Sequence, residues 1–150
     1  MAETDGNSIA KWLVIAGRQV SQHLDRQLET LGVNASQYHY ILKIHDNPGL
    51  LQKDLLATEF VNPSNVTRAI KQLVDRGIVV RKRLPTDKRA QQLRLTAKGA
   101  HLYPQIRAIL DPEEAQIRET IQKRFPSFQP EGFVDALKTI SRIHGDTDKQ

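Results

Sequence analysis

The feature that most constrains the fold of this 150-residue chain is a helical segment that stops at a glycine and leads directly into two strands. From Asn62-Pro63, typical of a helix start, to Arg76, apolar residues recur at steps of three and four, which indicates one buried helix face. Gly77 can end that helix. Residues 78–84 and 91–95 are strand-like and enclose a polar turn, which predicts a β-hairpin. A helix followed at once by a hairpin is typical of a winged helix-turn-helix.

Helical periodicity also predicts helices at about 8–31, 36–46 and 51–59, and two more after residue 96. We expect the first of these last two to be kinked or briefly broken near residue 111, because Pro104 and Pro112 interrupt it. The predicted fold is mainly α with a small β-hairpin and about six helices. It forms a single domain over 1–150, with a winged helix-turn-helix lobe at 34–96 and a helical lobe for dimerisation made of 8–32 and 97–145.

Positive charge is concentrated in the winged segment. Residues 62–95 contain nine Lys and Arg against two Asp, a net charge of +7, whereas the rest of the chain carries −2. A basic surface on a mildly acidic body suits a polyanionic partner. On charge alone, a solvated basic hairpin explains the pattern equally well.

The predicted helix that precedes the hairpin has two chemically different faces. Its apolar residues should face the core, and its outward residues are short hydrogen-bonding groups followed by longer cations: Ser64, Asn65, Thr67, Arg68 and Lys71. Short polar side chains let a helix approach DNA closely, and Asn, Arg and Thr can contact base edges in a major groove. The alternative is an ordinary amphipathic helix with a polar exposed side.

The turn of the hairpin provides a second candidate contact with DNA. Lys88 and Arg89 lie at its tip, where a rigid hairpin can reach a minor groove. Asp87 is unsuited to contact phosphate. We expect it to accept hydrogen bonds within the turn or to hold an arginine such as Arg68 or Arg89 in place, and a plain turn-forming role is an equal alternative.

Several motifs resemble the MarR-type family of bacterial transcription regulators. Residues 87–99 match the wing signature D-x-R-x-x-x-L-x-L-T-x-x-G at all six of its positions. The segments 62–68, 73–79 and 37–42 resemble the family's recognition-helix opening, helix exit and second helix. Together these segments cover about residues 34–99, and the order of helices agrees over nearly the whole chain.

The resemblance implies a homodimer in which the first, fifth and sixth helices interleave, bound to a pseudo-palindromic operator as a ligand-responsive repressor. Ser64, Asn65, Thr67, Arg68 and Lys71 would contact or brace the major groove, Arg89 would enter the minor groove, and Asp87 would brace the wing. Relatives that bind small aromatic acids suggest an effector pocket, for which the candidate lining residues are Trp12, Arg18, Tyr38, His39 and Tyr40. The alternative is that Trp12 and Tyr38 belong to the core or the dimer interface.

Other classes of function lack their sequence signals. The chain has no cysteine, and its five histidines form no metal-binding pair, so we expect no metal and no cofactor. It has no nucleophile elbow and no phosphate-binding loop, so we do not expect an enzyme. Without a membrane span or a signal peptide we expect a cytoplasmic protein. Two alternatives to a regulator are an architectural DNA binder without an effector and a winged-helix module that binds an acidic protein.

Overall fold

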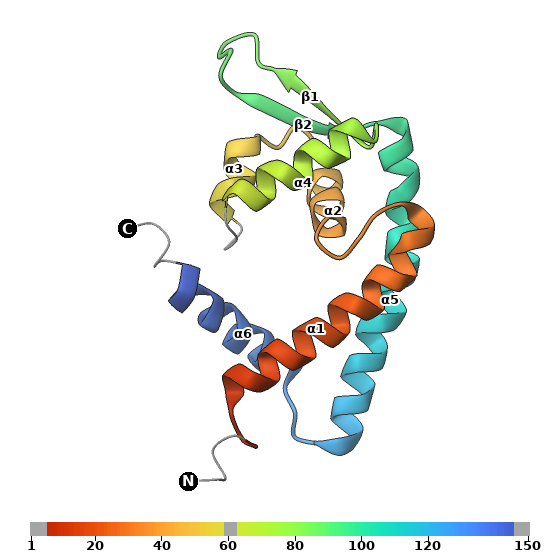
Figure 1. Ribbon diagram of the computed structural model, residues 1–150, viewed down its shortest axis with the longest axis vertical. Helices are drawn as coiled ribbons and strands as arrows, with labels where there is room; N and C mark the ends of the chain where they lie inside the picture. The colour runs from red at the N-terminus through yellow and green to blue at the C-terminus, as the bar shows by residue number, and fades with distance from the viewer. Residues whose placement is uncertain (1–5, 59–62, 146–150) are drawn as a thin grey trace.

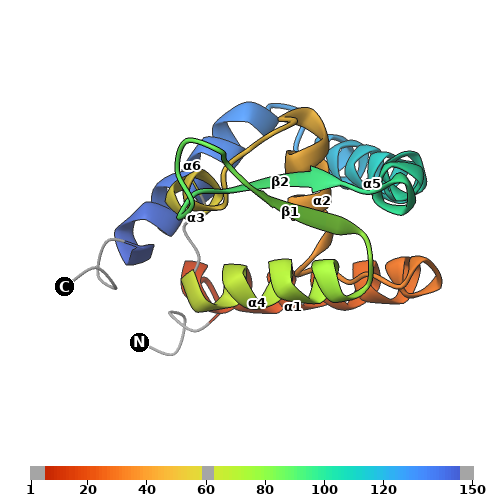
Figure 2. The same ribbon diagram turned by 90° about the horizontal axis from the view of Figure 1, so that it is seen from above.

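The computed structural model describes residues 6–58 and 63–145 (Figures 1 and 2). The expected helix cap at Asn62 lies outside the described residues. In chain order the elements are α1 (Ile9–Leu28), the 3-10 turn η1 (Glu29–Leu31), α2 (Tyr38–Asp46), α3 (Gln52–Thr58), α4 (Pro63–Asp75), β1 (Val79–Arg83), β2 (Gln91–Leu95), α5 (Ala97–Arg124) and α6 (Pro130–Gly145). The predicted fold class, mainly helical with one hairpin, is confirmed.

The helices and the hairpin are arranged in two regions. Figure 1 shows the hairpin at one end of the molecule beside α2, α3 and α4, and α1 and α6 at the other. Helix α5 starts next to the hairpin and runs to the far end. Figure 2 shows α1 and α6 on opposite sides of the molecule. The segments predicted for dimerisation thus reach the end of the molecule away from the wing, although α5 starts beside the hairpin (Figure 1).

The core lies between α2, α4 and the hairpin. Ile41, Ile70, Leu73 and Leu93 are fully buried there, and Ile44 is 1% exposed. Burying an aliphatic side chain of this size contributes about 1.5–3 kcal/mol to stability. On α4 the buried positions are Val66, Ala69, Ile70 and Leu73, which confirms the predicted apolar face.

The hairpin is antiparallel and is tied to the segment that follows α2. Its register pairs Val79 with Leu95 at the base and Arg83 with Gln91 near the tip. The backbone N–H of Leu93 donates to the carbonyl of Leu50 at 2.8 Å. The wing is thus held by main-chain hydrogen bonds as well as by its own pairing, so its tip projects from a fixed base.

The end of α4, the start of β1 and the start of α5 meet at one junction. Gly77 ends α4 with φ +72°, a conformation that favours glycine. The hydroxyl of Thr96 accepts from the N–H of Gly99 at 3.1 Å, and it donates to the carbonyl of Gly77 at 2.5 Å. Lys98 Nζ donates to the carbonyl of Arg76 at 2.8 Å. The predicted stop at Gly77 is confirmed, and both ends of the hairpin are fixed at this junction.

Of the two outcomes expected near residue 111, a kink or a brief break, the break is wrong. Helix α5 continues for 28 residues with Pro104 and Pro112 inside it. Both prolines are exposed. The carbonyls that lose their hydrogen-bond donors therefore lie on the solvent side, where water can satisfy them. On the inner side, Leu102 and Ile106 are buried in the core and hold the first half of the helix in place.

We predict that Gly99→Ala destabilises the protein. A Cβ atom at position 99 would lie 2.3 Å from the carbonyl oxygen of Ile78, so the backbones of α5 and β1 would have to separate. The expected loss is roughly 1–3 kcal/mol in the free energy of unfolding, measured by urea denaturation. Gly132→Ala is the matched control, because a Cβ there meets nothing closer than 3.9 Å. The control should be neutral or slightly stabilising, and an equal loss in both variants would contradict the close-approach argument.

Candidate nucleic-acid interface

The outward face of α4 carries the side chains that the sequence predicted. Ser64, Asn65, Thr67 and Arg68 are all exposed. They are exposed because the opposite face of the helix packs against the core through Val66, Ala69, Ile70 and Leu73. Among the described residues of α4, an acidic side chain occurs only at the C-terminal end, so the first two turns present hydrogen-bonding groups and positive charge.

Lys71 differs from the other candidates in having an acidic neighbour. Its Nζ lies 2.8 Å from Oδ2 of Asp75, one turn further along the helix, and both side chains are exposed. An exposed pair of this kind contributes at most about 0.5 kcal/mol. A DNA phosphate could therefore displace Asp75 at small cost. Arg68 forms no ion pair within the described ranges.

The wing tip presents Lys88 and Arg89, both exposed, on a turn that Asp87 organises. Oδ1 of Asp87 accepts from the backbone N–H of Arg89 at 3.0 Å. The backbone of Asp87 also accepts from the N–H of Ala90 and donates to the carbonyl of Leu84. In the part of the chain that the structure describes, the carboxylate of Asp87 forms no ion pair with the side chain of Arg68 or Arg89. Of the two roles expected for Asp87, the structure contains the hydrogen bond within the turn.

The arrangement is that of known transcription regulators. The MarR family model matches residues 33–90. A putative transcriptional regulatory protein for the hcr operon of Thauera aromatica is 29% identical over 149 residues, which cover 98% of this chain and 84% of that protein. The crystal structure of the transcriptional regulator SlyA superposes with a TM-score of 0.76 at 20% identity, covering 93% of this chain and 96% of the other. A mutant MarR from E. coli complexed with operator DNA superposes with a TM-score of 0.68 at 18% identity, covering 94% and 96%.

Residues 33–90 are similar to the MarR family. The match begins just before α2 and ends at the wing tip, so it contains every candidate DNA-contacting residue. The structural likenesses extend over more than nine tenths of the chain, which identifies the whole fold as the winged-helix fold of MarR and SlyA.

The five residues proposed for an effector pocket do not line one common cavity among the described residues, and Tyr40 is only 2% exposed. Trp12 and Arg18 are exposed on α1, and Trp12 donates its indole N–H to the carbonyl of Gly6 at 2.8 Å. Tyr38 lines a groove of about 560 Å³ between α1, α5 and α6, whereas His39 borders a separate recess beside α4. Burial, and secondarily the carboxylate of Glu114, raises the pKa of Tyr38.

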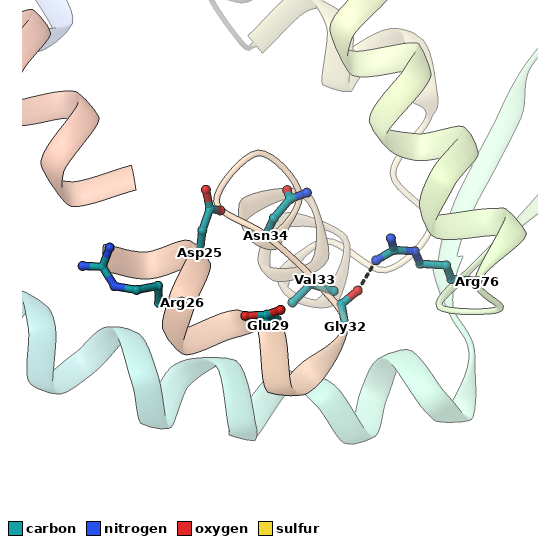
Figure 3. A pocket seen from close by; sticks show the side chains of 7 residues that line it. All are labelled: Asp25, Arg26, Glu29, Gly32, Val33, Asn34 and Arg76. Carbon is teal, nitrogen blue, oxygen red and sulfur yellow. Dashed lines mark hydrogen bonds between the residues drawn. The ribbon is translucent and has the colours of Figure 1, made fainter. Parts of the chain in front are cut away.

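Sequence reasoning missed the contact that joins α4 to the corner after α1. Arg76 Nη1 donates to the carbonyl of Gly32, at the edge of a recess of about 360 Å³ (Figure 3). At the same corner Oδ1 of Asp25 accepts from the backbone N–H of Ala35 at 2.8 Å. Arg76 and Gly32 are 44 residues apart in the sequence. No local pattern could have distinguished Arg76 from the other basic residues.

A second contact joins α2 to α5. The rings of His45 and Tyr103 stack with centroids 3.5 Å apart, and the Tyr103 hydroxyl donates to Oδ1 of Asp46 at 3.3 Å. Hydrogen bonding to His45, together with the Tyr103 bond, lowers the pKa of Asp46. The winged lobe is thus attached to the long helix by polar contacts as well as by the core.

Two other features are absent from the described ranges. No group of three or more His, Asp or Glu side chains there is placed to hold a metal ion. No helix there is long and apolar enough to cross a membrane.

We predict that Asp87→Ala loosens the wing tip without unfolding the protein. The variant removes the acceptor for the N–H of Arg89, so amide hydrogen exchange at Arg89 and Ala90, measured by NMR, should accelerate at least severalfold. Global stability should change by about 1 kcal/mol or less, because the turn is exposed. Asp87→Asn keeps an acceptor oxygen and is the control. Unchanged exchange in Asp87→Ala would show that the turn does not depend on this bond.

Proposed function

We propose that this protein is a transcription regulator that binds a pseudo-palindromic DNA operator as a homodimer and acts as a repressor. The observation that carries the proposal is the exposed N-terminal half of α4, whose outward side chains are hydrogen-bonding or cationic; no residue described in that half is acidic. This is the chemistry that a helix in a major groove requires. The MarR-family match and the MarR structure with operator DNA support it.

The wing supplies a contact that α4 cannot make. Arg89 and Lys88 stand at the tip of a hairpin whose base is fixed to α4 and α5, so the distance between helix and tip is set by the fold. We propose that Arg89 enters the minor groove beside the major groove occupied by α4. Negative potential is strongest where the minor groove is narrow, which favours an arginine there.

The helical lobe supports a homodimer. A groove of about 560 Å³ between α1, α5 and α6 is lined by apolar side chains, among them Leu13, Val20, Ile121 and Leu137. The large apolar residues of α6 stay accessible: Phe133 is 45% exposed and Ile143 is 64% exposed. A second copy inserting its own helices would cover these surfaces.

The total surface supports the same proposal. The chain exposes 10687 Å². A compact monomer of 17.0 kDa is expected to expose only about 7,700 Å². Obligate dimers commonly bury about 2,000–5,000 Å² in total, roughly half of it from each subunit, so a second copy would cover much of this excess. In such a dimer the two α4 helices would stand about 34 Å apart, one turn of DNA.

We also propose that the regulator responds to a small ligand. Tyr38 is a neutral hydrogen-bonding group in a mostly apolar groove, which suits a small aromatic compound. A ligand there would weaken DNA binding if it bound better to an arrangement of the lobes that does not fit the operator.

We predict that Arg89→Ala weakens operator binding by roughly 1–3 kcal/mol, because it removes the minor-groove contact. The operator would be selected from genomic fragments with the purified protein, and Kd measured by fluorescence anisotropy at several salt concentrations. Affinity of the wild-type protein should fall steeply with salt. Arg142→Ala, an equal loss of charge on α6, is the control. If micromolar wild-type protein shifts no duplex at low salt, the DNA-binding proposal fails. An unchanged Kd in Arg89→Ala would contradict only the proposed minor-groove contact of the wing.

We predict a dimer at micromolar concentration. Light scattering should give a mass near twice 17.0 kDa. Placing a charge in the groove with Leu137→Glu should shift the protein toward monomers, because a buried unpaired carboxylate is costly. A monomeric wild-type mass would contradict the proposed assembly.

A further inference from the structure

A second recess lies between the N-terminal turn before α2 and the flank of α4. It measures about 410 Å³, and the residues around it include Asn34 and His39 on one side and Asn65, Arg68 and Gln72 on the other. The three residues of α4 belong to or adjoin the face proposed to contact DNA. The two on the other side belong to a segment that the sequence did not connect with DNA.

The polar groups of this recess suit an anion. None of the residues lining it is acidic, and Arg68 carries a positive charge. Oδ1 of Asn34 already accepts from the N–H and the hydroxyl of Ser36, at 3.0 and 2.7 Å. Oε1 of Gln72 already accepts from Nε2 of Gln37 at 2.7 Å. With both carbonyl oxygens engaged, the amide groups of Asn34 and Gln72 have their N–H donors left for a ligand.

Side-chain contacts beneath the recess fix the residues that line it. Gln37 is 1% exposed, the only buried polar side chain in the described ranges, and its bond to Gln72 joins the start of α2 to the middle of α4. The ring of His39 lies 3.9 Å from that of Tyr40 and 5.8 Å from that of Tyr38. Donors fixed in advance bind a ligand with a smaller loss of conformational entropy.

We propose that this recess holds a phosphate of the DNA backbone, so that the turn before α2 is a third contact element beside α4 and the wing. The inference rests on the proposed function, since it takes the DNA to lie against α4. A strand flanking the major groove that α4 occupies would pass the open side of the recess, next to Asn65 and Arg68. Its phosphate would receive hydrogen bonds from Arg68 and from the amides of Asn34 and Gln72.

A phosphate contact of this kind has a specific consequence. Backbone contacts fix the register of a protein on DNA and carry no sequence information. The recess should therefore increase the affinity for all duplexes equally, whereas Asn65 and Thr67 should increase the affinity for the preferred duplex. The bond between Gln37 and Gln72 also helps to fix the orientation of α4 about its own axis. A phosphate bound in the recess would therefore relate that orientation to the position of the DNA backbone.

The decisive variant is Asn34→Asp. Aspartate keeps the oxygen that accepts from Ser36 and replaces the amide donor by a second oxygen with negative charge, so the turn should fold as before. We expect the Kd for the selected duplex and for an unrelated duplex to rise by the same factor, about tenfold or more at low salt. Circular dichroism and light scattering on the same samples should show unchanged folding and assembly.

Gln122→Glu is the matched control, because it makes the same chemical change at an exposed position of α5 far from the recess. It should raise Kd less than twofold. If Asn34→Asp behaves like Gln122→Glu while the wild-type protein binds DNA, the recess does not hold a phosphate, although the proposed function stands. If the wild-type protein binds no duplex, both proposals fail together.

A second measurement locates the contact on the DNA. Duplexes in which one phosphate at a time is replaced by a neutral methylphosphonate should weaken wild-type binding at a position beside each major groove. At that position the replacement should reduce the DNA affinity of the Asn34→Asp variant little or not at all, because the neutral methylphosphonate no longer repels the aspartate. Equal losses in both proteins at every position would overturn the inference. A loss of dimer mass in Asn34→Asp would overturn it too, by assigning the recess to the subunit interface.

Discussion

The close approach of α5 to β1 is the constraint on which the rest of the molecule depends. Gly99 places the first turn of α5 directly against the carbonyl of Ile78, and Thr96 caps α5 while donating to Gly77. At this point the end of α4, both ends of the hairpin and the start of the long helix are joined within a few residues. The wing and α4 therefore move as one body with α5.

That constraint relates the proposed DNA contacts to the proposed assembly. Helix α5 continues from the junction to the apolar groove of the helical lobe, through two prolines on its exposed side. If a second copy fills the groove, the position of each α4 is determined by a rigid path from the dimer interface. Arg76 and the pair of Asp46 and Tyr103 add polar contacts along that path. A change in the groove could then alter the spacing of two α4 helices.

Much of the interface was predictable because its signals are local. The alternation of Val66, Ile70 and Leu73 with polar residues fixes which side of α4 is exposed, and the glycine and strand pattern that follow fix the hairpin. Asp87 was expected either to accept hydrogen bonds within the turn or to hold an arginine, and it accepts from the backbone N–H two residues later. For α5 the prolines predicted a kink or a brief break, and the break was wrong because the rule for proline does not include which side of the helix faces water.

The sequence by itself determined the elements, their order and the concentration of positive charge, since these follow from periodicity and from the backbone preferences of glycine and proline. Only the tertiary structure decided which side chains meet. It separated Trp12, Arg18, Tyr38 and His39, which the sequence had grouped: Trp12 and Arg18 are exposed on α1, and the adjacent residues Tyr38 and His39 point to different sides of α2. It joined Gln37 to Gln72 and Arg76 to Gly32 across 35 and 44 residues. Contacts between distant segments depend on how helices pack, and no pattern along the chain encodes that packing directly.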